Sequence, residues 1–474
     1  MSSNRRDFLK KSGLAGLGLF GAAGVIGAKK EEDPFIDNKK NDRNSFNMHG
    51  FAAPAIDTVG VAIIGLGNRG TGTTRRLASI EGVEIKALCD LEPDRVTRAK
   101  EAIQHTSHNP DGYSGGENEW KKVCERDDID LVAIVTPWHL HTPMCVYAME
   151  NDKHAYTELV AAQTIDECWQ LVETSERTRK HCVQMSSSCH SGRQAYLLNM
   201  VRNGVFGELI HAEGAYIHDL LRNYNFTKDM YHNMWRLKEN TGRHGSLYPQ
   251  HGFVPIAQMM DLNYGDTVES LVSVSSKDFM MGKTAKELAA EDDFWKPYVG
   301  KDYRGNMNIT TMRTYKGSTI VIQHDVSSPR PRPHLPLISG TEGFYSDGRF
   351  ATDHRGYKSE EEFQEMVETY TPEITKKFAE ALSKAQNTER AGHSYYNVTE
   401  TDWRLIDCLR NGLPVEMDVY DAALSSAIIP LSEWSVANRF NSVRMPDFTS
   451  GAWKNNKRGM NVNLENGGGN TAII

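Results

Sequence analysis

The sequence predicts an α/β protein in which a doubly wound parallel sheet is followed by an α+β domain with an open, largely antiparallel sheet. Two observations support this prediction. Between about residues 58 and 189, short apolar runs alternate with helical segments, as in consecutive βαβ units. After about residue 190, strand-like segments gather and long helical patterns follow them: strands at 208–217, 267–276, 308–315 and 318–324, and helices at 359–385, 399–411 and 416–440.

The first βα unit contains a glycine-rich string. The apolar run Val59–Ile64 leads directly into GLGNRG (65–70), and a helix is expected over about 71–80. Gly65 allows a tight turn, Gly67 lets the backbone approach a pyrophosphate, and Gly70 allows close packing of helix on strand. The N-terminus of that helix offers free N–H groups to phosphates.

A second apolar run, 83–89, ends in Asp90, twenty residues after Gly70. Asp90 is placed to accept hydrogen bonds from a ribose 2′-OH and would repel a 2′-phosphate, so NAD is expected rather than NADP. Strand, glycines, helix, second strand and acid all occur in register. We therefore predict an NAD-binding Rossmann domain over residues 58–189; the alternative is a structural Gly-rich turn.

Composition excludes several classes of protein. The chain of 474 residues is long enough for two or three domains, and its net charge of −8 leaves no basic footprint for nucleic acid. Its seven cysteines are scattered, without a CxxC pair or metal-ligand spacing, so we expect buried free thiols and no metal site.

The two ends of the chain are expected to lie outside the domains. NRRDFLK (4–10) and the Gly/Ala-rich stretch 13–28 are similar to a twin-arginine signal peptide over residues 1–30, which predicts export to the periplasm or beyond. That stretch is too short and glycine-dense for a stable membrane span. We expect a linker or arm over 31–57, an α+β domain over 190–450 and a surface tail over 451–474.

The order of elements over about 59–450 resembles the Gfo/Idh/MocA family. In most of that family the fourth strand ends in Glu-Lys-Pro, and the lysine contacts the hydroxyl being oxidised. Here the corresponding residues are Glu158, Leu159 and Val160. The missing lysine argues against an ordinary sugar dehydrogenase.

Several strings are similar to one branch of that family, the NAD-dependent glycoside hydrolases of family 109, known as α-N-acetylgalactosaminidases. Besides the leader, they are GLGNRG (65–70), WHLH (138–141), TE (157–158), GAYIHDL (214–220), WR (235–236), YPQHG (248–252), and QHD (323–325) followed by SPRP (328–331).

The resemblance implies two sets of site residues. The cofactor set comprises Gly65, Gly67, Asn68, Arg69, Gly70, Asp90, Trp138, His141, Glu158, Ser187 and Tyr248. The substrate set comprises Tyr216, His218, Arg236, Tyr248, His251 and Arg332. Two positions depart from the branch: Ser187 replaces a cofactor-contacting asparagine, and Arg332 replaces a substrate-contacting tyrosine. An arginine exchanges an aromatic stacking face for a cationic fork, which suits an anionic or differently substituted sugar.

A glycosidase that uses NAD avoids direct displacement at the anomeric carbon. Transient oxidation at C3 acidifies C2–H, the aglycone leaves C1 by elimination, water adds, and C3 is reduced again. His251 is expected to move the C3 hydroxyl proton, with Tyr248 sharing that proton or holding the sugar. Tyr216 contacts the sugar or takes the C2 proton, and Glu158 orients the nicotinamide or the sugar.

Two other functions remain open from the residues: an exported sugar oxidoreductase with net hydride transfer, and a sugar-binding protein without activity. The aromatic loop with Tyr224, Tyr231 and Trp235 suits sugar stacking and hydrophobic packing equally. A small glycoside or oligosaccharide is the expected partner. The family's open sheet often mediates dimers, so a homo-oligomer is expected.

Overall fold

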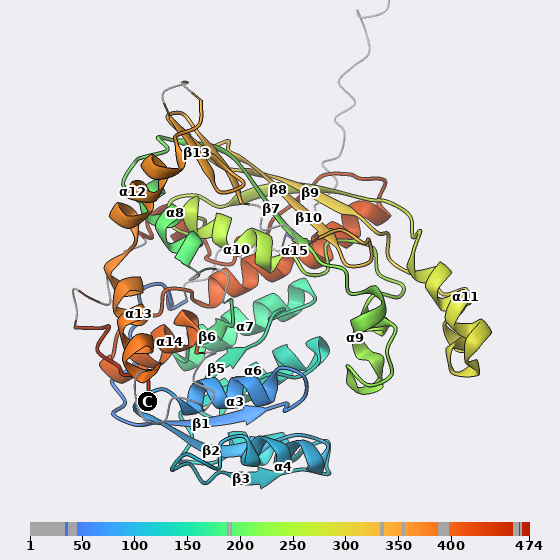
Figure 1. The fold of residues 1–474 in the computed structure, drawn as a ribbon, viewed down its shortest axis with the longest axis vertical. Coiled ribbons are helices and arrows are strands. Elements are labelled where there is room, and N and C mark those ends of the chain that lie inside the picture. Colours follow the sequence, from blue (N-terminus) through green and yellow to red (C-terminus); the bar gives the residue numbers. More distant parts are fainter. Residues whose placement is uncertain are drawn as a thin grey trace, which may run out of the picture.

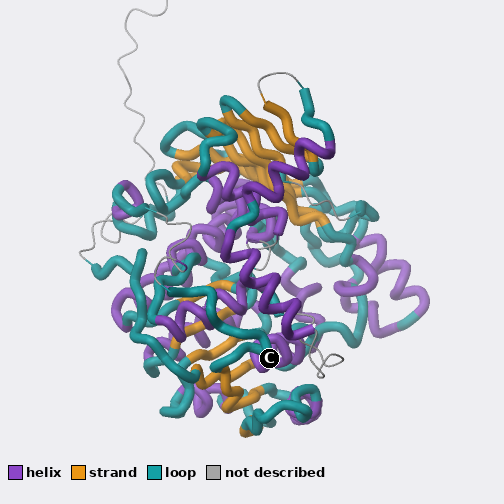
Figure 2. Tube along the Cα trace, turned by 60° about the vertical axis from the view of Figure 1, so that its left-hand side comes forward, coloured by secondary structure: helices purple, strands orange, loops and turns teal. Residues whose placement is uncertain are grey.

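The computed structural model describes residues 34–36, 45–186, 189, 192–331, 336–352, 356–386, 398–457, 464 and 467–474. Two separate groups of strands are joined by a layer of helices (Figures 1 and 2). The predicted fold class is confirmed, because one sheet is parallel and the other largely antiparallel.

The N-terminal sheet has six parallel strands in the order β3-β2-β1-β4-β5-β6. Its strands are β1 (Val59–Ile64), β2 (Val83–Cys89), β3 (Asp111–Tyr113), β4 (Leu131–Ile134), β5 (His154–Thr157) and β6 (Cys182–Gln184). Its helices are α3 (Gly70–Ala78), α4 (Pro93–Glu101), α5 (Glu119–Cys124), α6 (His141–Glu150) and α7 (Ile165–Thr178).

The central strands of this sheet are apolar throughout because helices cover both faces. Every residue of β1 and of β4 is buried. The chain leaves β1 toward β2 on one side and continues through β4 and β5 on the other, so the order reverses at β1. Ligands bind outside the carboxyl ends of the strands at such a switch point.

The C-terminal sheet has eight strands in the order β13-β12-β11-β7-β10-β9-β8-β14, and only the β7–β10 pair is parallel among these described strands. They are β7 (Leu209–Ile217), β8 (Val268–Ser275), β9 (Asn308–Thr314), β10 (Thr319–Asp325), β11 (Leu337–Gly340), β12 (Gly343–Ser346), β13 (Arg349–Thr352) and β14 (Val443–Arg444). The accompanying helices are α8 (Gly192–Arg202), α9 (Trp235–Glu239), α10 (Gln250–Met259), α11 (Met281–Glu291), α12 (Glu360–Tyr370), α13 (Glu373–Gln386), α14 (Glu400–Asn411) and α15 (Val419–Ala437).

Helix α15 lies between the two sheets and holds them together (Figure 1). It contacts α7 and β6 of the first domain and β8 and α10 of the second. Asp418 caps its N-terminus by accepting hydrogen bonds from the backbone N–H groups of Tyr420 and Asp421. One hydrophobic cluster therefore continues through both domains, with Val132, Trp169, Phe253, Leu271 and Ile428 among its members.

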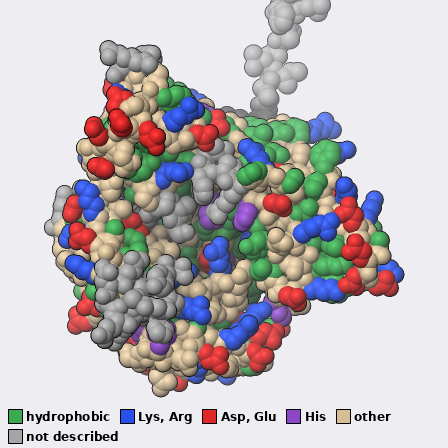
Figure 3. Space-filling view, viewed as in Figure 1, with side chains coloured by type: hydrophobic (Ala, Val, Ile, Leu, Met, Phe, Trp, Pro, Cys, Tyr) green, Lys and Arg blue, Asp and Glu red, His purple; other side chains and the backbone are tan. Residues whose placement is uncertain are grey.

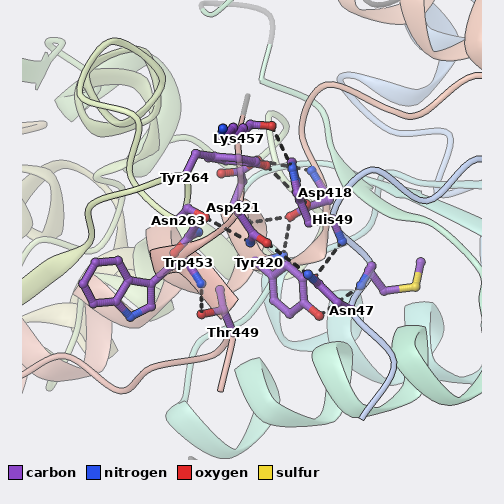
Figure 4. A network of polar contacts seen from close by, with 12 residues as sticks. Asn47, His49, Asn263, Tyr264, Asp418, Tyr420, Asp421, Thr449, Trp453 and Lys457 are labelled. Atoms are coloured by element: carbon purple, nitrogen blue, oxygen red, sulfur yellow. Dashed lines mark hydrogen bonds and ion pairs between the residues drawn. The ribbon is translucent and has the colours of Figure 1, made fainter. Parts of the chain in front are cut away.

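The N-terminal arm docks at the same helix start (Figure 4). The backbone N–H of Met48 donates to the Tyr420 hydroxyl at 3.1 Å. His49 Nδ1 lies 3.7 Å from Asp418, and Nε2 lies 2.9 Å from the carbonyl oxygen of Lys457. Burial opposes protonation of His49, but the Asp418 carboxylate outweighs it and raises the pKa of the imidazole.

Two sequence-based expectations need correction. The surface tail predicted for 451–474 is wrong for 467–474, where Thr471 accepts a hydrogen bond from Trp403 Nε1 at 2.7 Å and Ile473 bridges to Ile80. A segment without apolar periodicity can still adopt one defined structure when it packs against the surface of a folded domain. The helix predicted over 359–385 is two helices, α12 and α13, because Pro372 follows the first one and cannot continue it.

All seven cysteines are buried free thiols, as predicted. Within the described residues, no helix combines the length and the apolar character that crossing a membrane requires.

The buried histidines at the amino ends of β5 and β6 predict acid sensitivity. His154 and His181 stack with ring centroids 5.1 Å apart, and burial lowers the pKa of both, that of His181 to about 4. An unfolded histidine titrates near 6.5, so the unfolded state binds more protons below that pH. We expect the stabilisation from His181, up to about 3 kcal/mol, to be present above pH 6.5 and lost as pH falls toward 4.

Urea denaturation at several pH values measures this loss. His181→Phe should reduce the loss of unfolding free energy between pH 6.5 and 4. The exposed control His244→Gln should leave that loss unchanged. Equal losses in His181→Phe and the wild-type protein would contradict the assignment.

Candidate active site

A cleft of about 1080 Å³ opens between the domains at the carboxyl ends of the parallel strands. Histidine side chains gather near the centre of the face drawn in Figure 3, between the two domains. The predicted site residues that line the cleft are Gly65, Gly67, Asn68, Arg69, Asp90, Trp138, Glu158, Tyr216, His218, Arg236, Tyr248 and His251.

The glycine string forms a cradle that fits a pyrophosphate. Gly65 has φ +91°, and a Cβ there would lie 2.5 Å from the Val135 carbonyl oxygen. A Cβ at Gly70 would overlap the Gly65 carbonyl oxygen, so this glycine is required for helix α3 to start against the strand. A Cβ at Gly67 would meet only the Arg95 guanidinium, at 3.5 Å, which leaves the backbone open to the cleft.

Asp90 follows β2 and lines the same end of the cleft. Its Oδ2 accepts from the Leu66 backbone N–H at 2.6 Å, and its Oδ1 accepts from the Glu92 N–H at 2.9 Å. Each carboxylate oxygen can accept a further hydrogen bond, so both remain able to receive ribose hydroxyls. The geometry of the glycines and of Asp90 therefore fits NAD.

Glu158 directly follows β5 and faces the cleft beside the cradle. Burial raises the pKa of its carboxyl above the ordinary value, and the nearby Arg69 charge offsets part of that rise. Burial and then the Glu158 charge raise the pKa of the Tyr248 phenol. Tyr248 therefore stays protonated at neutral pH and acts as a hydrogen-bond donor.

A close approach of backbones brings Tyr216 and His251 together. Gly214 of β7 lies against Gly252 of α10, and a Cβ at Gly214 would overlap the Gly252 carbonyl oxygen. A Cβ at Gly252 would lie 2.6 Å from the Ala215 nitrogen. The first turn of α10 therefore rests on the strand, and the rings of Tyr216 and His251 stack 5.0 Å apart at 19°.

Aromatic rings continue from this pair toward the cofactor end. Tyr248 lies 4.8 Å from Tyr216 and stacks on Trp138 at 5.4 Å. The Arg236 guanidinium lies 5.2 Å from the Trp138 ring and 5.0 Å from the Tyr248 ring. Trp138 also packs against Trp235, so residues from both domains form one wall of the cleft.

Besides Gly70, which lets helix α3 start against the strand, three predicted residues do not line the cleft. His141 is fully buried behind its wall, where Nδ1 lies 2.6 Å from the Val160 carbonyl oxygen and Nε2 lies 2.7 Å from that of Thr136. The prediction that His141 lines the cofactor site is therefore wrong, because both ring nitrogens face backbone carbonyls. Ser187 and Arg332 lie outside the described residues.

The sequence reading missed several lining residues. Arg95 lies 3.5 Å from Asp90, and its position five residues after that acid in the next helix was an available signal. Met230, His232 and Lys238 come from the loop before α9 and from α9 itself. No local pattern connects that loop with the glycine string, because the contact joins residues far apart in the chain.

This arrangement can bind a dinucleotide and a sugar in one space and can move protons through imidazole, carboxyl and phenol groups. Among the described residues, no group of three or more His, Cys, Asp or Glu is placed to hold a metal ion.

Comparison with protein families divides the chain in the same way as the structure. Residues 59–186 match the oxidoreductase family with an NAD-binding Rossmann fold, and residues 192–455 match the C-terminal domain of glycosyl hydrolase 109.

Curated relatives extend this match over most of the chain. An α-N-acetylgalactosaminidase of Bacteroides fragilis is 42% identical over 85% of this chain and 95% of its own length. A glycosyl hydrolase family 109 protein of Shewanella pealeana is 39% identical over 96% of this chain and 98% of its own length.

Solved structures share the fold at low identity. A levoglucosan dehydrogenase in complex with NADH has a TM-score of 0.60 at 16% identity and covers 82% of this chain and 100% of its own. The WlbA dehydrogenase of Bordetella pertussis, in complex with NADH and UDP-GlcNAcA, has a TM-score of 0.57 at 13% identity, covering 83% of this chain and 100% of its own. The chain therefore belongs to glycosyl hydrolase family 109 and is a glycoside hydrolase whose Rossmann domain binds NAD.

Proposed function

We propose that the protein is a retaining glycosidase that uses NAD as a recycled cofactor and cleaves by transient C3 oxidation, C1–C2 elimination, water addition and re-reduction. The supporting observation is the distribution of acids in the cleft. Direct displacement needs two carboxylates flanking the glycosidic bond. Among the described lining residues, Glu158 is the acid whose charge acts on Tyr248, whereas Asp90, Glu92 and Glu117 all come from the segment between β2 and α5.

When bound, NAD supplies the hydride acceptor and donor for C3 of the sugar. The protein supplies the proton transfers. His251 takes the proton of the C3 hydroxyl as that carbon is oxidised and returns it after reduction. Tyr248, held protonated by burial, donates a hydrogen bond to the sugar. Arg236 positions the ring from the wall that it shares with Trp138 and Tyr248.

The C2 proton leaves as the aglycone departs from C1, and the aglycone oxygen takes up a proton. Water then adds across the same bond, so the sequence causes no net redox change. Tyr216 touches the sugar at this side or takes the C2 proton, and Glu158 orients the reacting rings. The raised pKa of Glu158 suits a group that exchanges protons near neutral pH.

The proposed substrate is an α-N-acetylgalactosaminide-like or related glycoside. The name of the Bacteroides fragilis relative supports this sugar. Arg332, in place of the tyrosine of the branch, favours a differently substituted or anionic sugar among the candidates. Net sugar oxidation is the alternative, and Leu159 in place of the family's lysine argues against it.

A panel of nitrophenyl α- and β-glycosides, offered without added NAD, tests the function. We expect many turnovers of phenol release per protein without accumulation of NADH absorbance, because the hydride returns to C3. In deuterated water the sugar product should carry deuterium at C2. Stoichiometric NADH without phenol would instead establish the oxidoreductase.

His251→Asn should lower kcat/KM by about 10²–10⁴-fold while retaining NAD, because it removes a general acid–base group and keeps a polar side chain. His139→Gln, an exposed histidine at the same cleft, is the matched control and should keep most of the activity. Wild-type turnover in His251→Asn would remove His251 from the mechanism.

We propose export by the twin-arginine route, supported by the string NRRDFLK, which lies outside the described residues. This route transports folded proteins, so the cofactor can be acquired before export. Arg5→Lys combined with Arg6→Lys should leave the protein in the cytoplasm, as followed by cell fractionation with a Sec-exported marker as control. Unchanged export of this variant would refute the assignment.

We propose that the outer face of the open sheet forms a homodimer. Ile210, Val274 and Ile309 lie on β7, β8 and β9 and are 44–52% exposed. Exposed apolar side chains gathered on one face of an open sheet indicate an interaction surface, here for a second copy of the chain. Ile309→Arg should convert a dimer to a monomer in light scattering, whereas Phe279→Arg outside the strands should not. A wild-type monomer would contradict the proposal.

A further inference from the structure

We propose that residues 227–234, here called the strap, close over the bound dinucleotide and make NAD a retained rather than an exchanging cofactor. The inference rests on the proposed function, in which each hydride returns to the sugar. The strap belongs to the C-terminal domain, between the short π-helical turn Leu221–Asn225 and α9.

The strap lies over the glycine cradle with hollow space on both sides. Met230 lines the main cleft and also a second pocket of about 680 Å³. Gly67, Asn68 and Arg95 line both spaces as well. The strap therefore separates the cradle from the outside at the place where a pyrophosphate would lie, and a dinucleotide leaving in that direction must pass it.

Contacts across the domain boundary hold the strap down. His232 Nδ1 lies 3.5 Å from Glu92 Oε1, two residues after the ribose-binding Asp90. Beyond the strap, Gln163 of the first domain donates to Glu239 of α9 at 2.7 Å. Within the C-terminal domain, Lys228 at the start of the strap pairs with Asp292 at 2.6 Å.

The charge on the strap matches the surface that it faces. Asp229 lines the second pocket together with Arg75, Arg95 and Arg98, and Glu101 is the other acid in its lining. The first-domain side of this pocket carries three guanidinium groups against the one carboxylate of Glu101, so its net positive charge attracts Asp229 and favours the closed position.

The backbone conformation at the end of the strap indicates that its surroundings fix the strap in the closed position. Asn233 (φ 51°, ψ 24°) and Met234 (φ 47°, ψ 40°) are consecutive left-handed residues, which side chains with a Cβ disfavour. Such conformations persist where the surroundings hold them in place. Here they turn the chain so that Trp235 packs on Trp138.

The test measures release of NAD⁺ from the loaded protein, without any glycoside. Alcohol dehydrogenase and ethanol convert each released NAD⁺ to NADH, which absorbance records. We expect His232→Gln and Glu92→Gln each to raise the dissociation rate about two- to fivefold, the effect of losing one exposed ion pair. The double variant should release no faster than the faster single variant, because both changes break one contact.

His244→Gln is the matched control. It breaks a histidine–carboxylate contact of similar exposure, 3.0 Å from Asp302, which does not line the cleft. Its release rate should equal that of the wild type. A Glu92→Cys, His232→Cys variant, cross-linked with a bismaleimide, should hold NAD⁺ while the uncross-linked variant releases it; the native cysteines are buried and spared.

Wild-type release rates in both single variants would overturn the proposal, as would equal rates with and without the cross-link or an equal acceleration in His244→Gln. If one of these results is found and the wild-type protein still hydrolyses glycosides, the proposed function stands and only the strap proposal is refuted. If the strap variants release NAD⁺ faster but the protein hydrolyses no glycoside, the strap proposal stands and the proposed function is refuted.

Discussion

The site depends on one contact between backbones, the approach of Gly252 in α10 to Gly214 in β7. A methyl group at either position would push the helix from the strand. The ring of His251 would then leave that of Tyr216, and both would leave the space opposite the cofactor cradle. Helix α15 adds the second constraint, because its packing between the sheets sets the separation of the two halves of the cleft.

The chemistry of the cleft follows from this enclosure. Burial keeps the Tyr248 phenol protonated and raises the pKa of Glu158, so both groups differ from their counterparts in water. His251 is half-buried and lies at the junction of the aromatic wall with the open space. The fold is shared with dehydrogenases such as levoglucosan dehydrogenase, so the groups in the cleft rather than the fold decide the reaction.

The comparison with dehydrogenases also explains why this protein would benefit from a strap over the cofactor. A dehydrogenase must release its reduced cofactor after each turnover, whereas an enzyme that returns the hydride gains by holding it. Under the proposed export route, the protein would also leave the compartment in which NAD is made. The contact of His232 with Glu92 joins the two domains at this point, close to Asp90, the proposed partner of the ribose.

The amino-acid sequence by itself determined the cofactor half of the protein. The strand, the glycines of 65–70, helix α3 and Asp90 are neighbours in the chain, and their spacing specifies their geometry. It also indicated Glu158, since a polar residue after a buried strand lies at the sheet's carboxyl edge. The resemblance also implied His141, yet its ring turns to two carbonyl oxygens behind the wall.

Only the tertiary structure decided the rest. The stacking of Tyr216 on His251, the docking of Thr471 on Trp403 and the position of the strap over Gly67 each join segments that lie far apart in the chain. Local periodicity reports which face of an element is buried, but not which partner buries it. The physical reason is that these contacts form between surfaces that exist only after both domains have packed around α15.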